Sequence, residues 1–190
     1  MALAKPMQPK AALLFSKADR LELTLCQQMN RMGYYRTIRL FFRAISRLGD
    51  GVFWYSLALA LPFVYGAEAI LALGHITLTA LLCVAVYSQL KNRLVRQRPF
   101  ISFRDITAHT APLDLYSFPS GHTMNAVNFA VLFSVFFPAL LWIVAPFALL
   151  VALSRVILGM HYPTDVLVGA ALGSLISIGS LILFPTGMFA

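Results

Sequence analysis

Two basic residues at the end of an apolar stretch are the first candidates for chemistry. Lys91 and Arg98 lie seven residues apart, about two helical turns, so one helix that continued past the membrane surface would present both on one face. Arginine offers bidentate donors and lysine a mobile point charge, which together suit a tetrahedral oxyanion such as phosphate. Pro99 would then end that helix. A positive-inside anchor at the membrane surface is the alternative, and it suits Arg93 and Arg96 better than this pair.

A second candidate group is Pro119-Ser120-Gly121-His122, which directly precedes another apolar stretch. A Ser-Gly pair at a helix start presents free backbone N–H groups and the positive end of the helix dipole, which together bind anions. The imidazole of His122, on the same turn, could therefore touch a bound phosphate. For four residues in isolation, a polar cap at the membrane interface is the better interpretation.

The third group consists of Arg155, His161 and Asp165. A proline-containing break at residues 162–164 places His161 in a connection and Asp165 in the first turn of the next helix. At this spacing the carboxylate can reach the imidazole, fix its tautomer and leave the other ring nitrogen free as a nucleophile. The alternative is a structural ion pair between Arg155 and Asp165, with His161 as a bystander.

The composition indicates that a membrane-embedded structure positions these groups. Of the 190 residues, 59% are hydrophobic and only 12% are charged, far from the averages of soluble domains. After Asp114, Arg155 and Asp165 are the only charged residues, and ionisable side chains in hydrocarbon are costly and usually functional. Cys26 and Cys83 suit neither a disulfide framework nor a metal cluster, so we interpret both as packing residues.

Hydropathy predicts about five membrane spans, each of up to about 20 apolar residues. We expect them at residues 52–65 (extendable to 67), 69–90, 123–137, 139–158 and 164–184. The third and fourth spans divide an uncharged stretch of 31 residues, Thr123 to Leu153, at Phe137-Pro138. This division returns His122 and Arg155 to the same membrane face. Small residues in the last span, including Gly169 and Gly173, permit close helix packing.

The first 50 residues differ from the rest, which suggests a basic segment at 1–50 in front of a membrane domain at 51–190. Five arginines between Arg31 and Arg47 are interleaved with apolar residues, a pattern typical of an amphipathic interfacial helix. Direct contact with anionic lipid and packing on the bundle with a solvated basic face both explain this pattern. The apolar run in residues 1–20 is short and interrupted by lysine, so we expect no cleaved signal.

Together, the three groups read Lys91-(six residues)-Arg98-Pro99, then Pro119-Ser120-Gly121-His122, then Ser154-Arg155-(five residues)-His161-(three residues)-Asp165. This order resembles, at every position, the three-part signature of the type-2 phosphatidic acid phosphatase superfamily, the lipid phosphate phosphatases, which share their site with vanadium haloperoxidases. The resemblance covers about residues 45–185. It implies an all-α polytopic transmembrane bundle and a metal-independent phosphoric ester hydrolase without a cofactor.

The resemblance also implies a role for each matching residue. His161 would attack phosphorus to form a phosphohistidine, Asp165 would orient it, and His122 would protonate the departing oxygen and later activate water. The phosphoryl oxygens would be bound by a cationic cage formed by Lys91, Arg98, Arg155, Ser120 and the Gly121 N–H. Such a cage stabilises the charge that a metal ion stabilises in other phosphatases. His75 and His109 receive no role.

The expected substrate is a lipid phosphate monoester or pyrophosphate, of the phosphatidate, phosphatidylglycerophosphate, undecaprenyl diphosphate or lipid A phosphate type. Two other functions stay open. One is a lipid phosphotransferase that uses the same site, and the other is a non-enzymatic lipid-binding membrane protein, in which loss of His161 or Asp165 would be expected. The expected partners are a lipid phosphate and membrane lipids, with no nucleic acid.

The resemblance and the charge distribution disagree on the orientation in the membrane. Family members commonly have six spans, the first of which precedes the region of residues 46–51, where this chain has basic amphipathic sequence; a sixth span would require residues 11–45 to insert. Five spans place the basic segment and the site on one face and the C-terminus on the other. The positive-inside rule puts that face in the cytoplasm. The resemblance implies an extracytoplasmic site in a bacterial inner membrane, which we adopt.

Overall fold

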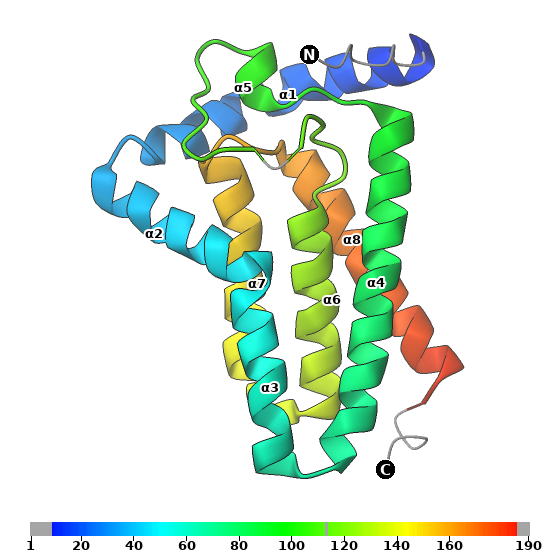
Figure 1. Cartoon of the computed structure of the whole chain (residues 1–190). Coiled ribbons are helices and arrows are strands. Elements are labelled where there is room, and N and C mark those ends of the chain that lie inside the picture. The colour runs from blue at the N-terminus through cyan, green and yellow to red at the C-terminus, as the bar shows by residue number, and fades with distance from the viewer. Residues whose placement is uncertain (1–8, 113, 186–190) are drawn as a thin grey trace.

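The computed structural model describes residues 9–112 and 114–185, and it contains no strand within these ranges. The α-helices are α1 (Pro9–Met32), α2 (Arg36–Arg47), α3 (Phe53–Tyr65), α4 (Glu68–Leu94), α5 (Pro99–Ser102), α6 (Gly121–Phe136), α7 (Leu141–Ile157) and α8 (Pro163–Leu183). A π-helical turn at Leu48–Val52 joins α2 to α3, and a 3-10 turn at Pro138–Leu140 joins α6 to α7 (Figure 1).

Five of these helices, α3, α4, α6, α7 and α8, form a bundle with α6 in contact with α4, α7 and α8. Aromatic and aliphatic side chains fill its core, among them Trp54, Phe133 and Val144. The outer surface is apolar as well, since Phe63 is 91% exposed and Trp142 82% exposed. A large apolar exterior around an apolar core is expected where lipid takes the place of water. The prediction of an all-α polytopic transmembrane bundle is confirmed.

The five expected spans correspond to α3, α4, α6, α7 and α8. Within the described residues, four helical segments are long and apolar enough to cross a membrane, namely Arg36–Tyr65, Glu68–Leu94, Pro138–Ile157 and Pro163–Leu183. The first of these includes α2 as well as α3. Helix α6 has 16 residues, or roughly 24 Å at about 1.5 Å per residue, and is enclosed by its neighbours.

The expected division at Phe137-Pro138 is confirmed, because α6 ends at Phe136 and α7 returns antiparallel to it (Figure 1). The start of α6 and the end of α7 therefore lie at the same end of the bundle. The expected close packing of the last span is also confirmed. A Cβ atom on Gly169 would lie 2.6 Å from the Ser120 carbonyl oxygen, and one on Gly173 would overlap the Met124 carbonyl oxygen.

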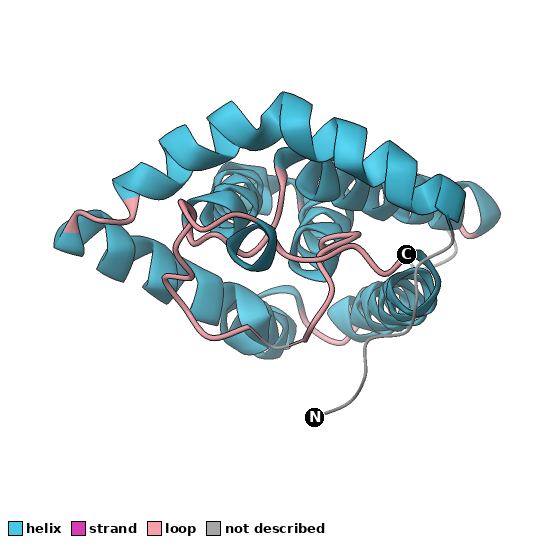
Figure 2. Cartoon of the chain, turned by 90° about the horizontal axis from the view of Figure 1, so that it is seen from above, coloured by secondary structure: helices cyan, strands magenta, loops and turns pink. Residues whose placement is uncertain are grey.

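Helices α1 and α2 lie at the end of the bundle that also carries α5 and the long loop before α6 (Figures 1 and 2). Helix α2 packs on α7, and α1 packs on α7 and α8. In α2, Phe42 is buried while Arg36 and Arg47 are exposed. The packing alternative for the basic segment is therefore observed, and its contact with anionic lipid stays a prediction.

The expected boundary at residues 50 and 51 falls inside the π-helical turn between α2 and α3, and it too stays a prediction. The first eight residues, on which part of the basic segment and of the expectation of no cleaved signal rests, lie outside the described residues.

Candidate active site

Lys91 and Arg98 meet at one carboxylate, that of Asp114. Lys91 Nζ lies 2.6 Å from Asp114 Oδ2, and an Nη2 atom of Arg98 lies 2.7 Å from Asp114 Oδ1. Arg98 also donates to the Met160 carbonyl oxygen at 2.8 Å, directly before the predicted nucleophile in the chain. The structure thus brings the first and third sequence groups together.

The expected geometry of this pair was wrong, because α4 ends at Leu94 and Arg98 does not belong to it. Val95 follows in the left-handed conformation with φ of 43°, and Pro99 begins α5 instead of ending α4. The chain turns inward here, and Arg98 donates to the carbonyl oxygens of Asp114 and Met160 at this end of the bundle. A helix that continued outward would not bring Arg98 to these oxygens.

Asp114 was not selected from the sequence. Partial burial raises its pKa, but the hydrogen bond from Lys91 and the charges of Lys91 and Arg98 outweigh this effect and lower the pKa below its ordinary value. The side chain is therefore an anion, and it is paired with two of the residues expected to bind phosphate, Lys91 and Arg98. Its position in the polar loop between two spans was the available signal, since a carboxylate near clustered cations is seldom unpaired.

The Pro119–His122 group begins α6 as expected. The Ser120 hydroxyl lies 2.9 Å from Thr123 Oγ1 and accepts from the Thr123 N–H at 3.4 Å, so it forms the N-cap of the helix. The Ser120 N–H donates to the Asp165 carbonyl oxygen at 3.0 Å, which joins this loop directly to the start of α8. The cap alternative therefore describes the Ser120 side chain in this structure, and its contact with phosphate stays a prediction.

His122 has a partner that the sequence analysis did not select. Its Nε2 lies 2.5 Å from Asp50 Oδ1, in the π-helical turn before α3. Gly51, with φ of 141°, allows this turn to redirect the chain from α2 into α3. A carboxylate on an imidazole orients the ring and stabilises its protonated form. An acidic residue beside glycines at the start of an apolar span was the sequence signal for this partner.

His161 and Asp165 lie side by side in the interior, with 1% and 0% of their surfaces exposed. His161 Nδ1 is 3.6 Å from Asp165 Oδ2, which is longer than a hydrogen bond. Oδ2 instead accepts the Tyr162 N–H at 2.9 Å, and Nδ1 has no hydrogen-bond partner among the described residues. The expected proximity is present without the expected hydrogen bond, which in free enzymes is often long.

The alternative ion pair between Arg155 and Asp165 is wrong. Asp165 Oδ1 is 2.5 Å from an Nη1 atom of Arg96, while Arg155 Nη1 donates to the Ser46 hydroxyl at 2.5 Å. Arg155 is buried, and its Nε has no hydrogen-bond partner in the described part of the chain. A buried guanidinium with a free N–H group beside His161 is well placed for an anionic ligand.

Arg96 is the centre of a buried ionic cluster that the sequence analysis missed. Its guanidinium contacts Asp19, Glu22 and Asp165, each at 2.5 Å, and donates to the Thr164 hydroxyl at 2.7 Å. Only 1% of Arg96 is exposed. The cluster ties α1 to the start of α8 and holds the carboxylate of Asp165, which is predicted to orient the nucleophile.

The interpretation as a surface anchor is therefore wrong for Arg96, whereas Arg93 is exposed as an anchor would be. The carboxylates of Asp19 and Glu22 lie more than 70 positions earlier in the chain, so local spacing gave no sign of this cluster.

The environment of His161 favours a neutral imidazole. Burial lowers its pKa well below the ordinary value, and the nearby charges of Arg98, Arg155, Lys91 and His122 lower it further. A neutral ring keeps a lone pair available for attack on phosphorus at neutral pH.

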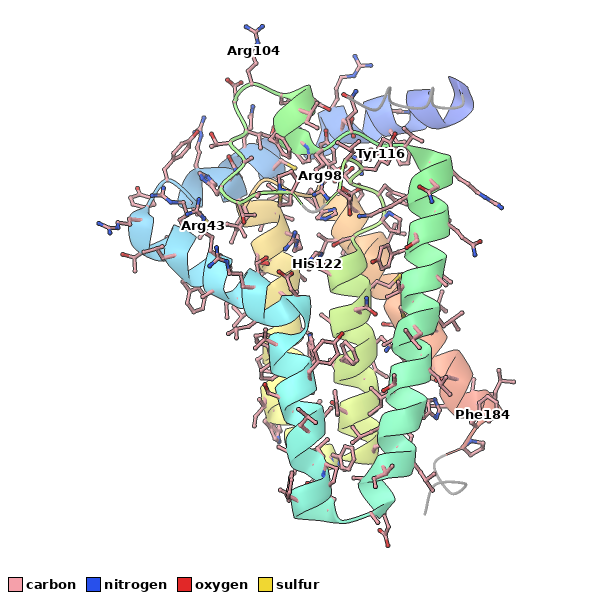
Figure 3. All side chains as sticks on the ribbon, viewed as in Figure 1. Arg43, Arg98, Arg104, Tyr116, His122 and Phe184 are labelled. Atoms are coloured by element: carbon pink, nitrogen blue, oxygen red, sulfur yellow. The ribbon has the colours of Figure 1, made fainter. Side chains whose placement is uncertain are left out.

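The other two histidines lie outside this group. His75 shares a hydrogen bond of 2.9 Å with the Ser180 hydroxyl, and His109 contacts the Asn30 carbonyl oxygen at 3.1 Å. Figure 3 shows Arg98 and His122 at the same end of the bundle, with Phe184 far from them. The Ser120 N–H donates to the carbonyl oxygen of Asp165, so the start of α6, with His122, lies against the start of α8, which follows His161. The two predicted catalytic histidines therefore lie at the same end of the molecule.

A cavity of about 480 Å³ opens from this site between α3, α4 and α6. Its polar end contains Asp50, Lys91, Asp114, Gly121 and His122, and its inner part is lined mainly by apolar residues such as Ala58, Ile76, Ala80, Phe129 and Phe133. Among the described residues, no three His, Cys, Asp or Glu side chains are grouped so as to hold a metal ion. The cavity therefore combines a charged end with an apolar channel.

Comparison with known proteins places this arrangement in a family. The lipid A 1-phosphatase of Rhizobium johnstonii is 33% identical over 102 residues, which cover 50% of this chain and 41% of that protein. The decaprenylphosphoryl-5-phosphoribose phosphatase of Mycolicibacterium smegmatis is 37% identical over 134 residues, which cover 67% of this chain and 68% of that protein. The crystal structure of Aquifex aeolicus LpxE superposes with a TM-score of 0.68 at 28% identity, covering 85% of this chain and 95% of that one.

The chain thus spans less than half the length of the Rhizobium relative. The family model of the PAP2 superfamily matches residues 69–188, which contain all three sequence groups. The fold, the order of the three groups and this match agree, and the chain belongs to the PAP2 superfamily.

Proposed function

We propose that this chain is an integral membrane phosphatase that hydrolyses a lipid phosphate monoester or pyrophosphate through a phosphohistidine. One observation carries the proposal: the buried imidazole of His161 lies within reach of the charges of Arg98, Arg155 and Lys91, and Lys91 lines the charged end of an apolar cavity. Membership of the PAP2 superfamily and the names of the two phosphatases compared above support it.

In the first half-reaction, His161 Nε2 attacks phosphorus, because Nδ1 faces Asp165. An N–P bond forms, the bond between phosphorus and the lipid oxygen breaks, and His122 donates a proton to that oxygen. The Asp50 carboxylate beside His122 favours the protonated imidazole needed for this transfer and partly offsets burial and the charge of Arg155, which disfavour it.

In the second half-reaction, the now neutral His122 accepts a proton from water, and the oxygen of that water attacks phosphorus. The N–P bond breaks, inorganic phosphate leaves, and His161 is restored with its lone pair. Both histidines end each cycle in the protonation state in which they began it.

The phosphoryl oxygens are bound by Lys91, Arg98 and Arg155, with the Gly121 N–H and Ser120 at the start of α6. In the free protein, Asp114 forms ion pairs with Lys91 and Arg98, so a phosphate must displace its carboxylate to bind them. The three positive charges stabilise the transition state in a site that requires no metal ion.

The test is hydrolysis by the purified protein of phosphatidate, phosphatidylglycerophosphate, undecaprenyl diphosphate and a lipid A phosphate, with chelator present. We expect His161→Ala to abolish turnover, and His122→Ala to retain slow phosphorylation of the enzyme by substrates with good leaving groups. His75→Gln, which changes a histidine remote from the site, serves as the matched control. Near wild-type hydrolysis by His161→Ala, or phosphate release only with added Mg²⁺, would refute the mechanism.

Added lipid alcohol distinguishes hydrolysis from phosphotransfer, since a transferase would form a new lipid phosphate at the expense of inorganic phosphate. A non-enzymatic lipid-binding protein would hydrolyse none of these substrates. The presence of both His161 and Asp165 favours an enzyme.

We also propose that the chain resides in a bacterial inner membrane with its site outside the cytoplasm. This placement follows the family resemblance, whereas the basic residues of α2 at the same end favour the opposite orientation. Arg104→Cys, in the exposed loop at the site end, should react with a membrane-impermeant maleimide in intact cells. Glu68→Cys, at the exposed start of α4 at the opposite end of the bundle, should react only after lysis, and the reverse pattern would place the site in the cytoplasm.

A further inference from the structure

The cavity contains a second polar level below the charged end. Trp54 and Asn125 both line it, and both carry a buried polar atom without a hydrogen-bond partner among the described residues. These atoms are the indole Nε1, a donor, and the amide Oδ1, an acceptor. Trp54 is only 1% exposed, so its N–H is removed from bulk solvent.

The two side chains share a position relative to the catalytic end. Asn125 follows His122 by three residues in α6, and Trp54 follows Asp50 by four residues at the start of α3. Asn125 lies one turn of α6 beyond His122, and the Trp54 ring stacks on Phe129 one further turn along the same face, so both side chains line the cavity below the His122–Asp50 pair. Along α6 this level is roughly 4.5 Å below His122, at about 1.5 Å per residue.

Below this level the lining becomes apolar. Phe129 and Phe133 continue the same face of α6, and the Trp54 ring stacks on Phe129 with centroids 5.0 Å apart. The stacking holds the indole in place from the side of the apolar channel. The Trp54 side chain is thereby held between the Asp50 end of the cavity and its apolar part.

An unpartnered donor and acceptor in such a place are costly unless a ligand supplies their partners. The ligand atoms at this level are those a few bonds beyond the scissile oxygen. In an acylated glycerol or sugar phosphate these atoms include ester carbonyl or hydroxyl oxygens. In an isoprenyl phosphate they are hydrocarbon, which leaves both protein groups unpaired.

We propose that Trp54 and Asn125 are specificity-determining residues that select lipid phosphates with hydrogen-bonding groups next to the phosphoester, namely acylated polyol phosphates, over isoprenyl and simple alkyl phosphates. This inference rests on the proposed function, since it assumes that the cavity holds the lipid substrate. The indole N–H donates to a carbonyl or hydroxyl oxygen of the polyol, and the Asn125 amide pairs with a hydroxyl or a second oxygen.

The test compares kcat/KM for three short-chain substrates: dioctanoyl phosphatidate, its dialkyl ether analogue without carbonyl groups, and dodecyl phosphate. An acylated glucosamine 1-phosphate serves as the sugar arm. The wild type should prefer the ester and the acylated sugar.

Trp54→Phe keeps the stacked ring and removes the N–H, and Asn125→Leu keeps the size and removes the amide. Each should lower kcat/KM for phosphatidate about tenfold, the effect of one hydrogen bond in a dry site. Each should leave kcat/KM for dodecyl phosphate within about twofold.

Hydrolysis of dodecyl phosphate also reports folding, so the ratio of the two substrates is the decisive quantity. The inference is overturned if both variants leave this ratio unchanged, as expected where water alone satisfies the two groups, or if the wild type prefers dodecyl phosphate. A variant that loses both activities is judged by the other variant, because Asn125 is only half-buried and tolerates replacement more readily. Failure of the proposed function has a separate outcome, in which the wild type hydrolyses none of the substrates.

Discussion

Replacing Arg96 by glutamine should damage both stability and turnover, although Arg96 does not touch the cavity. Its guanidinium is the partner of three carboxylates, of which Asp165 is completely buried and Glu22 nearly so. Burial alone lowers the pKa of Arg96, yet the charge of Asp165 and the hydrogen bonds with Asp19 and Glu22 raise it overall. The three carboxylates therefore keep the buried Arg96 side chain charged.

The magnitude follows from what the substitution leaves behind. Removing one partner of a buried ion pair costs about 3–5 kcal/mol, because the remaining charge is uncompensated. For a chain of this length, about 2–4 °C of melting temperature accompany each kcal/mol, so the midpoint should fall by roughly 6–20 °C. Turnover should fall as well, because Asp165 loses the group that fixes its Oδ1. A misplaced nucleophile can cost up to about 100-fold in rate.

The assay is thermal unfolding in detergent together with steady-state kinetics on short-chain phosphatidate. Arg93→Gln is the matched control, since Arg93 is an exposed arginine three residues earlier, and it should change neither quantity. Arg96→Lys keeps the charge but not the planar fork, so it should fall between the wild type and Arg96→Gln. A melting temperature and a kcat for Arg96→Gln that both match the control would refute the assigned role of the cluster.

Three further predictions concern the site and its supports. Asp114→Asn removes the carboxylate that competes for the phosphate ligands, so KM should fall severalfold in steady-state assays, and an increased KM would contradict this competition. Gly169→Ala places a Cβ 2.6 Å from a backbone oxygen of the loop before α6, so melting temperature and kcat should both decrease. Gly179→Ala, in open space on the same helix, should change neither. Because burial lowers the pKa of His161 well below its ordinary value and only its neutral form attacks, protonation of His161 should not reduce kcat/KM as pH falls through about 6.5, and the decline should begin only at lower pH; a decline centred on the ordinary value would contradict the shift.

The helices and the order of the catalytic groups could be predicted from the sequence because both are local properties. Hydropathy marks apolar segments of spanning length, and Pro138 marks the turn that a 31-residue uncharged stretch requires. The spacing of His161 and Asp165 across a proline-containing break likewise predicts that the two lie together. Each of these features lies within one continuous segment of the chain.

The ionic partners could not be predicted in the same way, because they come from distant segments. Asp50 lies 72 positions from His122, and Arg96 lies 69 positions from Asp165. No periodicity connects such pairs. From the local sequence alone, a charged residue in a loop of a membrane protein is explained equally well by a solvated position at the surface. The end of α4 at Leu94 was missed for the same reason, since the chain turns there to reach partners on other helices.

These carboxylates give the site a charge balance that bears on which phosphates it admits. Asp114 neutralises part of the charge on Lys91 and Arg98 in the free protein, so binding exchanges one anion for another. A phosphate monoester carries about −1.5 to −2 at neutral pH, whereas the carboxylate carries one negative charge. The exchange is favourable for a monoester because its additional negative charge is attracted by both cations. A phosphodiester carries a single charge and gains nothing by displacing Asp114. Since the phosphodiester lipids of the surrounding bilayer greatly outnumber any monoester, this exchange would keep the site free of them while admitting the substrate.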